Sequence, residues 1–163
     1  GGGEFVLSDL KRYTRQVKIN MPIWIFFIYM LHNNRYYRSL FYYRIGPVWS
    51  LLISWYRPGD RYFTIAKDMP IGGGLLMAHP YATILNAESI GCNFSCLHCT
   101  TIGKTSKGRP IIGDNVSLGA NVTIVGPVHI GNNVTVGAGS VIVKDVPDNC
   151  VVAGNPQRIV KSL

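Results

Sequence analysis

Residues 112–142 read IGDNVS-LGANVT-IVGPVH-IGNNVT-VGAGSV-I, and this stretch repeats itself every six residues. A large aliphatic residue opens each sextet, and valine or serine takes the fifth place. Glycine follows the aliphatic residue in four of the sextets, and asparagine takes the fourth place in three. A period of six matches neither an α-helix nor one long strand, and it is typical of a short strand and a turn that repeat many times.

The aliphatic row continues toward the N-terminus on the other side of an interruption at 103–111. Its further members, again six residues apart, are Ile102, Cys96, Ile90 and Ile84. We expect the row to stack into one core, because each repeat can bury its apolar face only against its neighbours. We expect the glycine and asparagine rows at the corners, where both residues tolerate positive φ. The pattern therefore favours a β-helix over a sandwich of short strands. A sandwich would not be expected to keep the aliphatic, fifth-position, glycine and asparagine rows in register.

These rows, and the segment 136–160 (VGAGSVIVKDVPDNCVVAGNPQRIV), resemble the hexapeptide-repeat acyltransferases. The resemblance covers roughly residues 62–163. It is closest to the branch similar to serine acetyltransferases, which includes enzymes that acetylate sugars of surface polysaccharides. It implies a mainly β fold, a left-handed parallel β-helix in which three hexapeptides make one triangular coil. It also implies a homotrimer, since family members place the active site between adjacent prisms.

Residues 1–62 have a different composition, and we expect them to form a short α-helical segment in front of a β-helix domain at 63–163. Fourteen of the eighteen aromatic residues lie between Trp24 and Phe63. Interruptions at Asn33-Asn34, Gly46-Pro47 and Arg57-Pro58-Gly59 predict two or three short helices there. The two longest apolar runs have about eleven residues each, whereas a membrane-spanning helix needs roughly 20.

The charge is also uneven, because ten of the sixteen Lys and Arg residues lie in 1–70 and the formal net charge is +8. A basic excess suits nucleic acid, an anionic membrane or a phosphorylated ligand. No nucleic-acid-binding module is recognisable, so we expect no nucleic-acid partner. Peripheral membrane contact through the N-terminal segment is one interpretation, and packing of the aromatic residues against each other and neighbouring subunits is the other. The first twenty residues lack the apolar core of a signal peptide, which favours a cytoplasmic location, extending to the inner membrane surface.

Transfer of an acetyl group to a hydroxyl requires a base for the attacking alcohol, and histidine has a suitable pKa. His79, in the segment GLLMAHP (74–80), occupies the place of the catalytic histidine in serine acetyltransferase-like enzymes. The alternative is a structural histidine at a corner of the coil. His98 is the second candidate, whereas His129 falls in an outward-facing slot and His32 at the end of a helix.

The acceptor is less well indicated. By the same resemblance, Thr64 stands where serine acetyltransferases carry an aspartate, and Asp68 is displaced from that place. Arg109-Pro110 replaces a second histidine before proline. These departures favour a sugar or surface-polysaccharide precursor, with serine O-acetyltransferase as the alternative. Arg109 suits a carboxylate or phosphate on the acceptor, unless it is simply an exposed loop residue. The candidate acceptor contacts are Asn86, His98 and Arg109.

Acetyl-CoA is the implied donor and co-substrate. By resemblance, Ala120 and Ala138 line the groove for the pantetheine arm with Val143 nearby, and Arg158 and Lys161 face the nucleotide. Lys104 and Lys107 are weaker candidates. Cys92, Cys96, Cys99 and His98 have the residue types of a metal site. No metal is expected, because Cys96 falls in the core row. We therefore predict an acetyl-CoA-dependent O-acetyltransferase. A non-catalytic β-helix scaffold or membrane-associated module is the alternative from another class.

Overall fold

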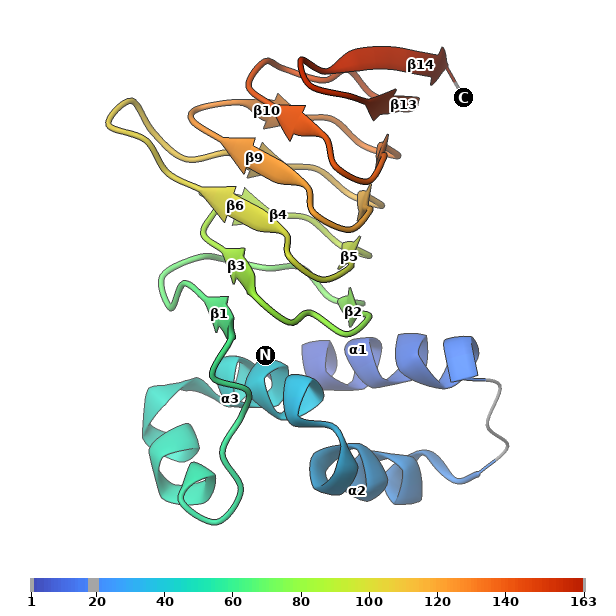
Figure 1. Ribbon diagram of the computed structural model, residues 1–163. Helices are drawn as coiled ribbons and strands as arrows, with labels where there is room; N and C mark the ends of the chain where they lie inside the picture. Colours follow the sequence, from blue (N-terminus) through green and yellow to red (C-terminus); the bar gives the residue numbers. More distant parts are fainter. Residues whose placement is uncertain (1, 18–20, 163) are drawn as a thin grey trace.

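The computed structural model describes residues 2–17 and 21–162, and it consists of three helices followed by a coiled stack of short strands (Figure 1). The helices are α1 (Gly2–Val17), α2 (Ile23–Asn33) and α3 (Arg35–Ser54). They lie together at the end of the stack where the strands begin, and the C-terminal strand closes the opposite end.

The strands form three sheets, which are the three faces of a prism. Face A consists of β1 (Phe63–Ile65), β3 (Thr83–Leu85), β6 (Thr101–Gly103), β9 (Thr123–Val125) and β12 (Val141–Ile142). Face B consists of β4 (Ser89–Ile90), β7 (Ile111–Ile112) and β10 (His129–Ile130). Face C consists of β2 (Leu76–Met77), β5 (Ser95–Cys96), β8 (Ser117–Leu118), β11 (Thr135–Val136), β13 (Cys150–Ala153) and β14 (Arg158–Ser162).

Successive sextets step from one face to the next. Ile112 lies on face B, Leu118 on face C and Ile124 on face A, and Ile130 returns to face B beside Ile112. Strands on one face pair in parallel, except that β14 runs antiparallel to β13. The protein is therefore a left-handed parallel β-helix with a helical segment in front, as the sequence predicted.

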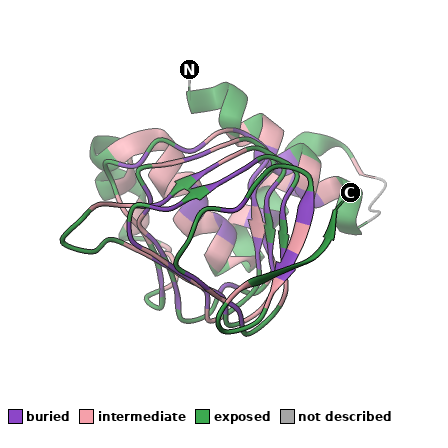
Figure 2. Ribbon diagram, turned by 90° about the horizontal axis from the view of Figure 1, so that it is seen from above, coloured by how far each residue is buried: buried purple, intermediate pink, exposed green. Residues whose placement is uncertain are grey.

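The aliphatic rows fill the interior of the prism. Figure 2 shows the result along the chain, where buried stretches alternate with exposed ones in the walls of the coils. Every first-position residue from Ile90 to Ile142 is buried, and so is the fifth-position row from Val116 to Ser140. The prediction for Ile84 was wrong, because its side chain is 46% exposed while Thr83 and Leu85 point inward. The step from Leu85 to the next core residue, Ile90, is five residues, and a slip of one residue turns a strand's side chains to the opposite face.

The corners confirm the asparagine row and correct the glycine row. Asn115, Asn121 and Asn133 have φ between 55° and 58°, in the left-handed region. The four glycines that follow the aliphatic residues do not have positive φ. They are required instead by the close approach of the next coil: a Cβ on Gly119 would lie 2.6 Å from the backbone nitrogen of Ala138. Sequence spacing located both rows, but it could not separate backbone conformation from lack of space.

The helices begin and end largely where the sequence indicated. α2 ends at Asn33, and the Asn34 side chain accepts hydrogen bonds from the amides of Tyr36 and Tyr37, which caps α3. Gly46 interrupts α3 with φ of 82°, because the following proline cannot donate the next backbone hydrogen bond. α3 then ends at Ser54, three residues before the predicted break at Arg57. Among the described residues, no helix is both long enough and apolar enough to cross a membrane.

Candidate active site

His79 lies at the corner between faces C and A of the first coil, two residues after β2. Its side chain is exposed, and its φ of 52° lies in the left-handed region. Ala82, at the same corner, also has positive φ, at 51°. Left-handed conformations are unfavourable for residues with a side chain, and they occur often at functional sites.

This corner is longer than those of the later coils. The step from Met77 to Ile84 is seven residues, whereas the step between the equivalent residues of the next coil, Cys96 and Thr101, is five. The additional residues are His79 and Pro80, since Ala78 N still donates to Cys96 O and Tyr81 O accepts from Cys99 N. The carbonyl of His79 accepts a hydrogen bond from Tyr81 N at 2.7 Å. The insertion thus presents the His79 imidazole at the edge of the prism.

The donor candidates follow His79 along the same edge. Met77, Cys96, Leu118 and Val136 stack in register on face C. Two residues further along the chain lie His79, His98, Ala120 and Ala138, which we call the corner column. His98, Ala120 and Ala138 lie in register, whereas Cys99 N donates to Tyr81 O, so His79 lies in the insertion at the end of the column. Strands in a sheet are about 4.8 Å apart, so the column runs about 10 Å from His98 to Ala138, with His79 beyond His98. The side chains shrink from imidazole to methyl along it.

The C-terminal strand lies at the far end of the corner column. Val152 pairs with Val136, so Gly154 is the next member of the column, and Arg158 pairs with the preceding residue, Ala153. Lys161 pairs with Val151, farther along face C. Both cations are exposed. The structure therefore brings Arg158 to the edge that carries His79 and sets Lys161 back from it.

The remaining candidates lie at a different corner, between faces A and B. Asn86 follows β3 and Val143 follows β12, each one residue beyond the stacked pairs of face A. Arg109 lies in the loop that projects from the prism between β6 and β7, together with the exposed Lys104 and Lys107 (Figure 1). This corner and the corner column are separated by four residues of extended chain, about 13 Å.

Arg109 forms an ion pair with Asp68, with 2.8 Å between Nη2 and Oδ2. The hydrogen bond from Arg109 holds the pKa of the Asp68 carboxyl below its ordinary value. Asp68, the displaced candidate partner of the base, is thus engaged by the arginine of the interrupting loop. Thr64 lies exposed on β1 of face A.

Residues 109–144 match the family model described as "Bacterial transferase hexapeptide (six repeats)". Over these residues the chain is similar to the hexapeptide-repeat transferases. The similarity to this family includes the regular coils, the interrupting loop's end and the second half of the corner column.

Several transferases of this kind are similar to the chain. It is 42% identical over 96 residues to serine acetyltransferase 2 of Arabidopsis thaliana, covering 56% of this chain and 30% of the relative. It is 44% identical over 101 residues to an Escherichia coli K12 protein named as a colanic acid biosynthesis acetyltransferase, WcaB, covering 60% of this chain and 62% of the relative. The chain thus spans less than two thirds of the length of these curated relatives.

Solved structures extend the similarity to the helices. The serine acetyltransferase of Neisseria gonorrhoeae superposes with a TM-score of 0.80 at 26% identity, covering 99% of this chain and 65% of that one. The soybean serine acetyltransferase apoenzyme superposes with a TM-score of 0.76 at 28% identity, covering 96% and 68%.

The helices hold the strand that leads to His79, a feature that sequence reasoning missed. The buried Tyr13 hydroxyl accepts a hydrogen bond from Met77 N at 2.9 Å and donates to Met77 O at 3.1 Å. Burial raises the pKa of the Tyr13 hydroxyl, which keeps it protonated. The helical spacing of Val6, Leu10 and Tyr13 signals a face that packs inward, but nothing in it names Met77 as the partner.

Proposed function

We propose that this protein is an acyltransferase that moves the acetyl group of acetyl-CoA to a hydroxyl, with His79 as general base. The corner column carries this proposal: an exposed imidazole at one end, two alanines in the middle and Arg158 at the other end. A long thiol ester with an anionic nucleotide fits such a series, since small side chains let its arm approach the backbone and a cation attracts its phosphates. The names of the similar proteins support the same chemistry.

The reaction follows from the position of the imidazole. The acceptor oxygen attacks the thioester carbonyl carbon, and His79 takes the hydroxyl proton as the new C–O bond forms. The C–S bond then breaks, and the proton passes from His79 to the leaving sulfur. An exposed histidine at a corner can meet both substrates only where a second surface closes over it.

We infer that this second surface belongs to a neighbouring copy in a homotrimer. The corner with Asn86, Arg109 and Val143 lies about 13 Å of extended chain from the corner column. One chain therefore does not hold all the candidates around one substrate, but two adjacent prisms can. Small outward residues on face C, such as Ser117 and Thr135, allow close approach of a neighbour, and cyclic symmetry closes such a contact.

We propose a sugar hydroxyl of a surface-polysaccharide precursor as the acceptor. The arginine of the Arg109-Pro110 loop, one quarter exposed beside Asp68, offers hydrogen bonds to an anionic or hydroxylated acceptor. L-serine is the second candidate, favoured by the names of the plant relatives and the solved structures. A cytoplasmic site of action would give access to acetyl-CoA and to such precursors.

Release of free thiol from acetyl-CoA tests the proposal directly, with a panel of sugars, nucleotide sugars and L-serine. We expect acceptor-dependent thiol release with a member of the sugar panel. Activity with L-serine alone would assign the second candidate, and no activity with any acceptor would favour a non-catalytic scaffold. Mixed trimers of His79→Ala and Arg109→Ala chains test the shared site. These two residues lie at different corners of one chain, so only a site built from two chains regains activity when two inactive chains are mixed.

A further inference from the structure

The second half of α3 exposes an unusual amount of apolar surface. Beyond the interruption at Gly46 the chain continues as a short helix from Pro47 and then through Trp55 and Tyr56. Its apolar side chains are all strongly exposed: Val48 68%, Trp49 62%, Leu51 76%, Leu52 59%, Ile53 45%, Trp55 82% and Tyr56 72%. Trp55 and Tyr56 also contact each other, with 6.2 Å between ring centroids.

In this segment, residues 47–56, the apolar side chains face outward and the small polar side chains face the protein, which is the reverse of a surface helix in water. At 100° per residue its apolar side chains occupy an arc of about 200°. Ser50 and Ser54 lie on the opposite side, half-buried, where they line a hollow together with Ser39 and Tyr42 of the first half of α3. A surface helix of a protein in water turns its apolar side inward. Here the small polar residues face the protein and the large apolar residues face outward.

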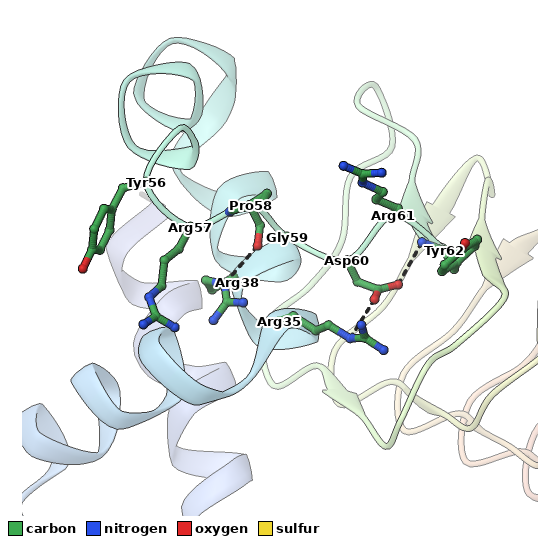
Figure 3. A pocket seen from close by; sticks show the side chains of 9 residues that line it. All are labelled: Arg35, Arg38, Tyr56, Arg57, Pro58, Gly59, Asp60, Arg61 and Tyr62. Atoms are coloured by element: carbon green, nitrogen blue, oxygen red, sulfur yellow. Dashed lines mark hydrogen bonds and ion pairs between the residues drawn. The ribbon is translucent and has the colours of Figure 1, made fainter.

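A basic hollow directly follows this segment. It has a volume of about 530 Å³ and is lined by four arginines, Arg35, Arg38, Arg57 and Arg61, but only one carboxylate, Asp60 (Figure 3). Asp60 pairs with Arg35 at 2.9 Å. Three positive charges are therefore left without a carboxylate in the hollow. Tyr56 lines its rim, so the apolar segment and the arginines form one continuous surface.

Not all guanidinium N–H groups of these arginines donate hydrogen bonds to other described residues. Arg38 and Arg57 both donate to the carbonyl of His32, at 2.9 and 2.8 Å, which holds their guanidinium groups close together. Arg61 has no hydrogen-bond or ion-pair partner among the described residues, and its side chain points away from the chain in Figure 3. A guanidinium group can donate two parallel hydrogen bonds to the oxygens of one phosphate.

We propose that residues 47–56 lie in the surface of an anionic phospholipid bilayer and that the arginine hollow receives lipid phosphates. The exposed aromatic and aliphatic arc supplies burial in the interface, and the arginines supply attraction to anionic headgroups. Either signal alone gives only marginal attachment, whereas the two together give stable peripheral binding. The site lies on the three helices α1, α2 and α3, which we call the helical cap. Its occupation does not depend on the proposed acetyl transfer.

The first test is flotation of the full chain with vesicles of phosphatidylcholine, alone or with phosphatidylglycerol. We expect binding to the anionic vesicles, weakened by salt. Leu51→Ser/Trp55→Ser should weaken it more than tenfold, because two large side chains leave the interface. Ile111→Ser changes another exposed aliphatic residue, on face B and 43% exposed, and should leave binding unchanged.

The second test removes charge in matched pairs. Arg35→Gln/Arg61→Gln should weaken binding to the anionic vesicles about 25-fold, since each charge near such a surface contributes about fivefold, or about 1 kcal/mol. Lys104→Gln/Lys107→Gln removes the same charge from the projecting loop and should have little effect. Arg61→Gln alone breaks no contact, so its fivefold effect is measurable even if the double variant folds poorly.

Three outcomes overturn the proposal. The wild-type chain fails to bind either vesicle, or the matched variants bind alike, or Leu51→Ser/Trp55→Ser lowers the assembly size in light scattering without vesicles. The last result would assign the surface to a second copy of the chain. Competition with free inorganic phosphate distinguishes lipid from a soluble ligand, with chloride as the control salt. If phosphate displaces the protein from vesicles only at the concentration at which chloride does, lipid is the ligand. Displacement at a much lower phosphate concentration would assign the hollow to a soluble phosphate. Thiol release with soluble acceptors, measured without vesicles, reports separately on the proposed transferase.

Discussion

The prism and the helical cap bury their residues in opposite ways. In the prism, the coils place mostly aliphatic residues inside and small or polar residues at the corners, and the arrangement repeats. In the cap, a pair of ionised residues and a tyrosine hydroxyl lie buried against the first coil, while large apolar side chains of α3 face outward. The prism is thus stabilised by many similar contacts, and the cap's junction with it depends on a few polar ones.

The difference has a consequence for function. The corner column is built by the repeat, so the donor candidates Ala120 and Ala138 are supported from both sides by neighbouring coils. His79 lies in the first coil, which has a neighbour on one side and the cap on the other. The catalytic end of the column therefore depends on the less regular part of the molecule.

The largest effect should come from His79→Ala. Removal of a general base typically lowers kcat by about 10²–10⁴. His79 is exposed, so the free energy of unfolding should change little. The measurement is steady-state thiol release at saturating acetyl-CoA, with His129→Ala, another exposed histidine of the prism, as the control. Full activity in His79→Ala would move the base elsewhere, with His98 the next residue to replace.

Arg44→Met should destabilise the junction by about 3–5 kcal/mol in urea unfolding at a fixed protein concentration. Arg44 donates to Asp9 at 2.9 and 3.2 Å, and both side chains are almost fully buried. The replacement leaves the Asp9 carboxylate buried without its charged partner, with backbone hydrogen bonds such as that from Leu75 N, at 2.7 Å.

The pH dependence of this variant checks the cause. Burial raises the pKa of Asp9 above its ordinary value of 3.8, and loss of Arg44 raises it further. The folded state then binds the proton more tightly than the unfolded chain. Stability should therefore rise as the pH falls from 7 toward 4 and should be lost again as the pH increases. A flat profile would mean that Asp9 contributes nothing to the defect.

A matched pair of leucines compares the two regions directly. Leu118→Ala should cost about 2–5 kcal/mol of unfolding free energy, because Leu118 is 2% exposed and its loss leaves a cavity in the prism. Leu52→Ala, at 59% exposure on the cap, should cost no more than about 0.5 kcal/mol. A large cost at Leu52 would show that the outward apolar surface is covered in the assembled protein.

The sequence predicts much of the prism because its contacts repeat. One six-residue period assigned the faces, the buried rows and the asparagine corners together. It failed only at Ile84, where the step to the next core residue is five, and at the glycines, where space rather than φ decides. In the cap, contacts such as Asp9 to Leu75 join residues 66 apart with no period, so no pattern indicates them.

The candidate site divides in the same way. His98, Ala120 and Ala138 fall on one edge because the repeat places them there, and the insertion of the first coil adds His79 at the same corner. Asn86, Arg109 and Val143 lie on another edge. The ion pair of Arg109 with Asp68 joins the interrupting loop to the segment before β2, two irregular parts that no repeat relates. Their roles remain predictions.

Tyr13→Phe tests whether the cap supports the first coil. The change removes one hydroxyl and leaves the N–H and C=O of Met77 without their partner, which should cost about 2–3 kcal/mol. Hydrogen exchange at the Met77 amide should accelerate, whereas exchange at the Leu118 amide, deep in the regular coils, should follow global stability. Equal protection of the Met77 amide from hydrogen exchange in wild type and variant would mean that the first coil is stable without support from the helices.

The smallest effect should come from Asn133, and it separates two reasons for the asparagine corners. The side chains of Asn93, Asn115, Asn133 and Asn149 form a ladder of hydrogen bonds at 3.0, 2.9 and 2.7 Å from coil to coil. Asn133→Gly keeps the left-handed conformation and removes two rungs, and we expect a loss of about 1 kcal/mol, because both groups are exposed to water. Asn133→Ala removes the same rungs and adds the cost of φ near 55° for a residue with a Cβ, so it should lose about 2 kcal/mol. Equal losses in urea unfolding would assign the corner to the ladder alone. A neutral glycine variant beside a destabilised alanine variant would assign it to backbone conformation alone, as the sequence reasoning supposed.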